Sequence, residues 1–493
     1  MASPYFYFKL KYRTKQTVDV CGIYHIDKFD KIGDRRTVIH FNLHKEVAMK
    51  YVEAVANIVC ATLLDPKVLQ NARRRKNAFT RNNRYLPYWT MMKLLLCNMK
   101  DTIAATLDGF FKAMHRSAGS SFEDTDIPVC TQQAFSKARG GINHTIFQEC
   151  FNRVLDFLCA PEAHEYQKRL GGLWGIQVIA IDGSRIPLPS RKVLLTKYGG
   201  TGANGDSPTA LASIAYDVLN DLVLDAHLEP LSVGERSLAI RHMEAIKNKS
   251  RANLFYTIFV FDRGYASQYM MTYIEEELQS KFLFRLRDKF NLRIDALPKP
   301  DSSKDIIDHH MNLYPGRKVR VLRFYLPSGT LETLITNEFD HDANLFKELY
   351  FLRWPCEEEY KLIKVKVGLT CFRGWAENSI LQEFWIAILV TNLVNVITRE
   401  TDGIIKCNTG EYDASRTSRF HYKTNKNETV GVLSRYFPDY MDADTESEKQ
   451  GIIKHIFKFL IIHKVIDKKG TGESSPRNEP RKARHHMNVK TTH

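Results

Sequence analysis

Two stretches of the sequence decide the fold: IQVIAIDG at residues 176–183 and FYTIFVFDRG at residues 255–264. Each is a run of β-branched and aromatic residues, which is the composition of a buried β-strand, and each is followed by an aspartate and then a glycine. A lone aspartate and glycine after a strand is more often only a turn. Asp182 and Asp262 therefore indicate a functional site only if the two strands are neighbours in one sheet.

The segments around these stretches predict the order of elements in that sheet. We expect strands at 210–218, 222–228 and 281–286, a helix at 235–247, and a second helix from an N-cap at Ser267 to about residue 279. Strand, strand, strand, helix, strand, helix, strand is the order of ribonuclease H-like domains, whose sheet is mixed. Strands one and four are adjacent in that fold, so Asp182 and Asp262 are expected to lie a few ångströms apart.

Two carboxylates at neighbouring strand ends favour a cation site, because like charges repel strongly unless cations lie between them. Oxygen ligands suit Mg²⁺ or Mn²⁺, which also bind phosphate oxygens. A third carboxylate on a nearby helix would complete a two-metal site for in-line displacement at phosphorus. The candidate for this third position is Glu357.

Glu357 lies in YFLRWPCEEEYKLIK, residues 350–364. On a helix that turns by about 100° per residue, four of these side chains fall within roughly 60° of one face. They are Tyr350, Arg353, Glu357 and Lys364. Without the two aspartates, the same pattern would indicate only a solvated charged helix. Pro355 cannot donate a backbone hydrogen bond, so the helix must kink or begin there.

These motifs resemble those of DDE transposases of the insertion sequence 4 family. The spacing Y-x2-R-x3-E-x6-K is the signature of that family, and residues 350–364 match it at all four positions. Residues 181–184 and 260–265 look like the family's first and second aspartate motifs, and residues 331–337 resemble the strand that re-enters its catalytic sheet after a β insertion. Residues 78–81, 133–139 and 480–484 are also similar to the family.

The resemblance implies a cut-and-paste transposase of an insertion sequence that depends on Mg²⁺ (or Mn²⁺), with two ions in each active site. The catalytic and metal-binding residues would be Asp182, Asp262 and Glu357, and the residues gripping phosphates near the cleaved bond would be Tyr350, Arg353 and Lys364. The family nicks the ends of its element, forms and opens a DNA hairpin, and joins the end to target DNA. The implied partners are double-stranded DNA (terminal inverted repeats and target) and a second copy of the chain in a synaptic homodimer, with no membrane.

Hairpin formation requires the terminal bases to unstack, and in related enzymes an aromatic side chain of the β insertion holds a flipped base. This sequence has no tryptophan between Asp262 and Tyr350. Phe290 and Tyr314 lie in irregular segments of the expected insertion and are the candidates for base stacking. The alternative is that both are packing residues.

The expected fold class is α/β, with a ribonuclease H-like catalytic domain that contains a β-rich insertion. A helical N-terminal DNA-binding domain precedes it and a helical C-terminal region follows it. An N-terminal extension is expected at 1–48, with strands suggested at 5–13 and 37–44, and the DNA-binding domain at 49–165. The two parts of the catalytic core are expected at 170–287 and 336–402, on either side of the insertion at 288–335. The C-terminal region follows at 403–466, and a basic disordered tail at 467–493.

Basic and amide-rich segments predict contacts with DNA. The chain has 71 Lys and Arg against 56 Asp and Glu, an excess that indicates a polyanionic partner, although a protein that is merely basic has the same composition. Residues 130–139 predict a short helix whose side chains can read base edges, or else lie on an ordinary exposed face. The candidate DNA-binding residues are Arg73, Arg74, Arg75, Lys76, Arg81, Arg84, Gln133, Lys137 and Arg139.

Other features narrow the class of protein. The nine cysteines form no C-x-x-C pair, which favours a reduced cytoplasmic location, here at a prokaryotic nucleoid. The longest apolar run, residues 384–397, is too short to span a bilayer and predicts a buried helix. GTGANG at residues 200–205 matches G-x-G-x-x-G, but a strand is expected after it, whereas a dinucleotide site requires a helix.

Two other functions stay open on sequence grounds. A ribonuclease H-like nuclease would hydrolyse DNA without joining it, and a strand-transfer assay separates it from a transposase. A catalytically retired DNA-binding protein derived from a transposon is the alternative of a different class. Three intact carboxylates argue against it, because a retired site has no reason to keep them.

Deleting residues 468–493 should weaken DNA binding in a salt-dependent way, because the segment after Ile466 carries seven Lys or Arg against three acids. The slope of log affinity against log salt should flatten by roughly 0.9 for each phosphate contact that is lost. The measurement is DNA affinity of the full and shortened chains over a salt series. An unchanged slope would show that the tail does not touch DNA.

Overall fold

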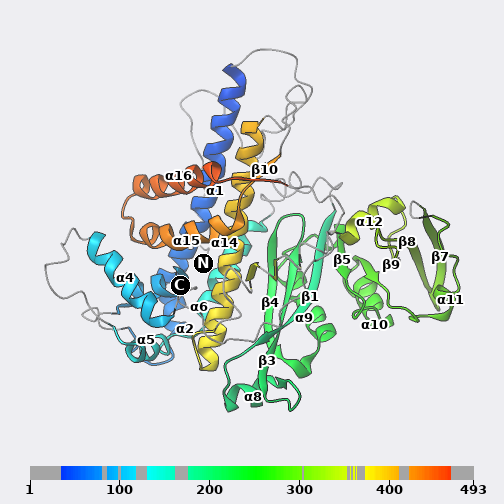
Figure 1. Cartoon of the computed structure of the whole chain (residues 1–493), viewed down its shortest axis with the longest axis horizontal. Helices are drawn as coiled ribbons and strands as arrows, with labels where there is room; N and C mark the ends of the chain where they lie inside the picture. Colours follow the sequence, from blue (N-terminus) through cyan, green and yellow to red (C-terminus); the bar gives the residue numbers. More distant parts are fainter. Residues whose placement is uncertain are drawn as a thin grey trace, which may run out of the picture.

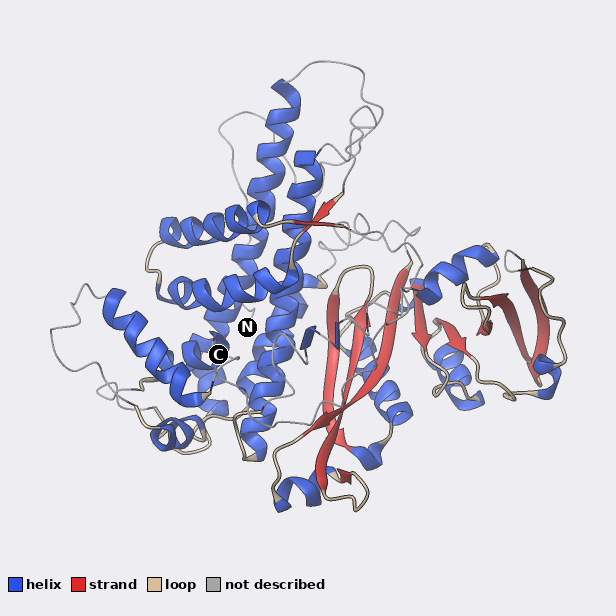
Figure 2. Ribbon diagram, viewed as in Figure 1, coloured by secondary structure: helices blue, strands red, loops and turns tan. Residues whose placement is uncertain are grey.

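The computed structural model describes residues 35–79, 86–97, 102–117, 130–160, 176–302, 305–351, 356, 359–360, 362–363, 372–409 and 421–467. The chain forms a body of helices beside a long, twisted sheet, whose far end lies at the right of Figure 1. The helical body combines helices from the beginning and the end of the described chain, and the sheet comes from the middle, as the colours of Figure 1 show. Figure 2 shows the division between helices and strands.

The sheet contains nine strands among the described residues. They are β1 (Gln177–Pro187), β2 (Gly200–Thr201), β3 (Ser207–Asp217), β4 (Leu222–Pro230), β5 (Thr257–Phe261), β6 (Lys281–Arg285), β7 (Ile306–Tyr314), β8 (Arg317–Tyr325) and β9 (Leu331–Thr336). Their order is β2-β3-β1-β5-β6-β9-β8-β7, with β4 beside β3. The predicted strands in this part of the chain are therefore confirmed, including the adjacency of the two Asp-bearing strands β1 and β5.

β1 is longer than expected. Its parallel pairing with β5 ends at Ala180 and Val260, but its antiparallel pairing with β3 continues to Pro187 and Thr209. Asp182 therefore lies inside a strand, at the point where one of its two neighbours ends. The sequence could not show this, because the neighbour that continues, β3, is set by tertiary pairing.

The predicted β-rich insertion extends the main sheet instead of forming a separate unit. β7, β8 and β9 form an antiparallel meander, and β9 pairs antiparallel with β6. The expectation that residues 331–337 return to the sheet is confirmed. The loop at 200–205 is flanked by β2 and β3 and opens no helix at this point, as expected.

The helices around the sheet are α8 (Lys192–Tyr198), α9 (Glu235–Asn248), α10 (Gln268–Thr272), α11 (Leu292–Asp295) and α12 (Ala343–Phe351). α9 contacts β1, β3 and β4, and α10 continues into a π-helical turn at Tyr273–Glu277. The predicted N-cap is confirmed, since the Ser267 side chain accepts a hydrogen bond from the backbone N–H of Met270 at 3.3 Å.

The helical body is made of α1 (Arg35–Leu64), α2 (Pro66–Ala72), α3 (Tyr88–Cys97), α4 (Ile103–Ser117), α5 (Gln132–Arg139), α6 (Thr145–Leu158), α14 (Glu377–Thr409), α15 (Lys426–Asp442) and α16 (Glu446–Ile462), with a short pair β10 (Tyr422–Lys423) and β11 (Val465–Ile466). The strand suggested at 37–44 is wrong, because these residues belong to α1. α1 packs against α6, α14 and α16, and these contacts favour one continuous helix. The suggestion at 5–13 lies outside the described residues.

α14 is the central helix of the body and contacts α1, α6, α15 and β4. Two described helical segments, Lys45–Leu64 and Glu377–Asn408, are long and apolar enough to cross a membrane, but 94% of the apolar window in the second is buried inside the protein. The buried helix expected at 384–397 is thus confirmed. Its asparagines have structural partners: Asn392 accepts a hydrogen bond from Val223 N at 2.8 Å and donates one to Val223 O at 2.9 Å.

Replacing Asn392 with leucine should destabilise the protein, because it leaves the buried N–H and C=O of Val223 without these partners. A buried backbone group that loses its hydrogen bond costs about 1–3 kcal/mol. The midpoint of urea unfolding measures the effect. Gln268→Ala, at an exposed position on α10, is the control and should change stability by no more than about 0.5 kcal/mol. Equal midpoints for the two variants would contradict the bridging role of Asn392.

Candidate functional site

The register of β1 and β5 brings Asp182 and Asp262 together. Each β5 residue in the pairing is numbered 80 higher than its β1 partner, from Gln177 with Thr257 to Ala180 with Val260. Asp182 and Asp262 are equivalent positions in this register, each two residues after the last pair of the two adjacent strands. Both residues are partly exposed, so their carboxylates are open to solvent and to ligands.

Each aspartate side chain accepts a hydrogen bond from the backbone N–H of the next residue. Asp182 Oδ1 accepts a hydrogen bond from Gly183 N at 2.9 Å, and Asp262 Oδ1 accepts one from Arg263 N at 2.8 Å. These bonds hold the side chains close to the main chain in similar ways. The pair therefore forms a preorganised arrangement of two carboxylates at the point where β5 ends.

The next strand, β6, brings the positive charge of Arg285 close to Asp262. The register of β5 with β6 pairs Phe261 with Phe284, so Arg285 is the next neighbour of Asp262. Its guanidinium Nη1 lies 3.6 Å from Asp262 Oδ1, and its Nε donates to the buried carboxylate of Glu332 at 2.6 Å. Burial alone would lower the pKa of Arg285, but its bond to Glu332 and nearby negative charges raise it, so Arg285 stays charged. Sequence reasoning missed Arg285, although the predicted order of strands could have identified it.

The backbone carbonyl of Asp182 is held by two side chains from distant parts of the chain. Ser213 on β3 donates its hydroxyl to Asp182 O at 3.0 Å, and Tyr360 donates to the same oxygen at 2.7 Å. Burial raises the pKa of Tyr360 well above its ordinary value, so its phenol remains a donor. The two bonds limit how far Asp182 can move relative to β3 and to the segment around residue 360.

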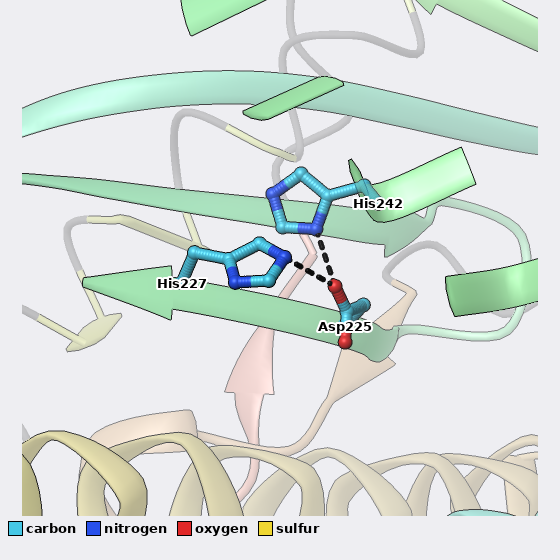
Figure 3. A group of neighbouring side chains, drawn as sticks. All are labelled: Asp225, His227 and His242. Atoms are coloured by element: carbon cyan, nitrogen blue, oxygen red, sulfur yellow. Dashed lines mark hydrogen bonds and ion pairs between the residues drawn. The ribbon is translucent and has the colours of Figure 1, made fainter. Parts of the chain in front are cut away.

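Behind Ser213 lies a buried group of Asp225, His227 and His242, drawn in Figure 3. His242 Nε2 lies 2.9 Å from Ser213 Oγ, and its Nδ1 lies 2.7 Å from Asp225 Oδ2. His227 Nε2 lies 3.0 Å from the same carboxylate oxygen. Burial alone would raise the pKa of Asp225, but the hydrogen bonds from the two histidines outweigh it and hold the pKa below its usual range.

The residue types of this group could hold a metal ion, but the geometry favours a hydrogen-bonded support. Both nitrogens converge on one oxygen at hydrogen-bond length, and Arg251 Nη1 lies 3.9 Å from the other oxygen of Asp225. Burial lowers the pKa of His242. His242 of this group contacts Ser213, and Ser213 donates to the backbone carbonyl of Asp182. The group therefore supports the strand that carries the aspartate.

The predicted helix at 350–364 is described only in part. Glu357, Arg353 and Lys364 lie outside the described residues, so their roles stay predictions. Tyr350 is 7% exposed, and the guanidinium of Arg285 lies 5.6 Å from the centre of its ring. The described neighbour Tyr360 is also buried and bonds to the Asp182 carbonyl, so this part of the chain passes the predicted site.

Several predicted DNA-binding residues share one surface. Arg74, Arg75 and Lys76 are exposed after α2, and Gln133 and Lys137 are exposed on α5. The two segments touch, because Arg75 Nη2 donates to the backbone oxygen of Lys137 at 2.7 Å. Arg73 is half-buried, and Arg81 and Arg84 lie outside the described residues. We call this surface of 74–76, Gln133 and Lys137 the basic surface.

Arg139 is placed differently from its expected DNA-reading role. It is 3% exposed, and its guanidinium donates to Gln382 at 2.7 Å, to Glu383 at 2.8 Å and to the backbone of Ser379 at 2.6 Å. These bonds attach α5 to the start of α14. Arg139 therefore acts as a structural residue here, a role that its place at the end of a short helix did not reveal.

The predicted stacking residues are also less exposed than expected. Phe290 and Tyr314 are half-buried and pack against the hydrophobic core, which agrees with the packing alternative and leaves a DNA role untested. Among the described residues, Trp375 is a more exposed aromatic, at 62%, with the guanidinium of Arg191 4.2 Å from its ring centre.

Replacing Arg139 with methionine should destabilise the protein strongly, because it leaves the carboxylate of Glu383 buried without its cation. Breaking such a pair costs about 3–5 kcal/mol. Lys137→Met, two residues earlier and exposed, should leave thermal stability nearly unchanged and weaken DNA binding. Thermal unfolding and DNA affinity of both variants test this. A stable Arg139→Met protein that has lost DNA affinity would reverse the assignment.

Comparison with known proteins identifies the segment that contains this site. Residues 173–393 match the family model of the transposase DDE domain. No curated protein matches the chain. A solved piggyBac transposase synaptic complex with hairpin DNA is similar at a TM-score of 0.44 and 7% identity, over 86% of this chain and 88% of that chain, and so distant a likeness supports no inference about function. The segment that matches the family model, residues 173–393, holds both Asp182 and Asp262.

Proposed function

We propose that the chain is a DNA transposase that moves an insertion sequence by cutting and joining DNA in a cut-and-paste reaction. The main support is the register of β1 and β5, which sets Asp182 beside Asp262 within the segment that matches the transposase DDE domain. The order β4-β3-β1-β5-β6 agrees with a ribonuclease H-like core. The spacing of residues 350–364 supports membership of the insertion sequence 4 family.

Asp182 and Asp262, with Glu357 as the third carboxylate, would hold two Mg²⁺ (or Mn²⁺) ions. The donors fit such ions because they are carboxylate oxygens, the ligands that hard divalent cations prefer. Arg285 offsets part of the negative charge on Asp262. Bound ions would activate the attacking oxygen and stabilise the leaving oxygen in displacement at phosphorus.

The chain's own residues would position the DNA. Ser213 and Tyr360 hold the backbone at Asp182, so its carboxylate meets the substrate in a fixed place. The basic surface carries Arg74, Arg75, Lys76 and Lys137, which are suited to phosphates. Arg353 and Lys364 would bind phosphates near the cleaved bond, and two copies of the chain would hold two element ends in a synaptic complex on DNA in the cytoplasm.

A nuclease with the same core is the second candidate, since the same carboxylates would also support hydrolysis. The two functions differ in whether a DNA 3′-hydroxyl or water attacks. A strand-transfer assay with a pre-cleaved element end separates them, because only a transposase joins that end to target DNA. Partly exposed carboxylates in a matched register argue against a retired, purely DNA-binding protein.

Alanine at Asp182, Asp262 or Glu357 should abolish both nicking and joining and leave DNA binding close to normal, because each change removes a predicted cation ligand. Glu358→Ala should be mild, since position 358 is turned by about 100° from position 357 on a helix. Asp206→Ala, at an exposed loop aspartate, is the matched control and should be fully active. The measurement is a gel that resolves nicked, hairpin and joined products. Nicking or joining of DNA by the Asp182→Ala protein would contradict the proposed function.

A further inference from the structure

Tyr265 is a buried polar residue that the described hydrogen bonds do not explain. It is 1% exposed, three residues after Asp262, and its ring packs against Phe261 with the two ring centres 5.3 Å apart. Among the residues that the structure describes, its hydroxyl has no hydrogen-bond partner. Burying a hydroxyl without a partner costs free energy, so a phenylalanine would pack here at lower cost. The hydroxyl therefore indicates a partner that is not a residue of the described chain.

Negative charges surround that hydroxyl. Burial raises the pKa of Tyr265 well above its ordinary value, and the charges of Asp182, Glu235 and Asp262 raise it further. The contacts agree with this, since Glu235 lies beside Gly183 and Gly264, which come soon after the two aspartates. A tyrosine phenol carries its proton at neutral pH and is a hydrogen-bond donor.

Glu235 is the member of this set that sequence reasoning missed. It is the first residue of α9, exposed, and without a hydrogen bond or ion pair to another described residue. Its side chain lies against the glycines that follow both aspartates. A Cβ atom added to Gly183 would be 2.9 Å from Glu235 Cγ, and one added to Gly264 would be 3.9 Å from Glu235 Oε2.

The start of α9 is attached to the Asp262 loop, which keeps Glu235 in this place. Arg236 Nε donates to Gly264 O at 2.8 Å, and its Nη2 donates to Ala266 O at 3.5 Å. A glutamate in the first turn of a helix is favoured by the helix dipole whatever its surroundings. That general preference does not explain the close approach to Gly183, nor the hydroxyl of Tyr265 nearby.

We propose that Glu235 and Tyr265 belong to the cation centre of Asp182 and Asp262, where Glu235 is a further carboxylate for the cation and its waters and Tyr265 donates a hydrogen bond to an oxygen atom bound there. The inference rests on the proposed function, since it extends the same centre. Mg²⁺ keeps several waters when it binds protein carboxylates, and those waters need acceptors. Glu235 is such an acceptor, and Tyr265 supplies the matching donor.

Mn²⁺ binding to the full chain without DNA tests the role of Glu235. Free Mn²⁺ is followed by electron paramagnetic resonance during a titration. Glu235→Gln should weaken Mn²⁺ affinity by about tenfold, the effect typical of losing a residue that supports a metal site. Glu244→Gln is the matched control, because it removes the same charge from an exposed position on α9. Equal affinity of the two variants would overturn the assignment of Glu235.

Tyr265→Phe tests the hydroxyl with little change of volume. Because the hydroxyl has no described partner, the variant should unfold at the same temperature as the natural chain or higher, yet cleave DNA at least tenfold more slowly. Tyr216→Phe is the contrast, since the Tyr216 hydroxyl donates to Asp221 at 2.5 Å, and it should lower the unfolding temperature. A Tyr265→Phe protein with unchanged cleavage would remove Tyr265 from the centre.

Asp182→Asn separates failure of this inference from failure of the proposed function. If Asp182→Asn loses Mn²⁺ affinity and Glu235→Gln keeps it, the centre stands and Glu235 is not part of it. If Asp182→Asn also binds Mn²⁺ as the natural chain does, the proposed cation centre is wrong, and Glu235 and Tyr265 have no centre to join.

Discussion

The parallel pairing of β1 with β5 is the constraint on which the rest of the site depends. It spans only four residue pairs, yet its register decides that Asp182 and Asp262 are neighbours. A shift of one residue would turn one aspartate to the opposite face of the sheet, because side chains alternate along a strand. Both strands are buried on both faces here, since Ile179, Ile181, Phe259 and Phe261 are buried and so are the residues between them.

Two neighbouring carboxylates repel each other, which raises the free energy of the folded chain. Different residues stabilise the two aspartates. Arg285 approaches Asp262 from β6 and is itself fixed by the buried Glu332. Asp182 has its backbone held by Ser213 and Tyr360. Behind Ser213, the buried pair of His242 and Asp225 fixes the orientation of the serine.

The helical body and the sheet are joined through α14, and this joint relates the predicted DNA-binding helices to the site. Asn392 bonds to the backbone of β4, and Gln382 and Glu383 bind Arg139 of α5. The basic surface on α5 and after α2 is therefore attached to the same helix as the sheet. Transposition as proposed needs such a connection, because a DNA end bound by the helices must reach the aspartates in a fixed orientation.

The sequence by itself determined most strands of the sheet between residues 176 and 286, the helices at 235–247 and after Ser267, and the adjacency of β1 and β5, because long hydrophobic runs and turn residues act locally. It also identified the basic surface by composition. Only the tertiary structure decided that Arg139 is buried against α14, that α1 includes residues 37–44, that Arg285 approaches Asp262, and that Glu235 lies against Gly183. These facts depend on contacts between residues far apart in the chain, and no local pattern of hydrophobicity or charge records which distant partner a side chain meets.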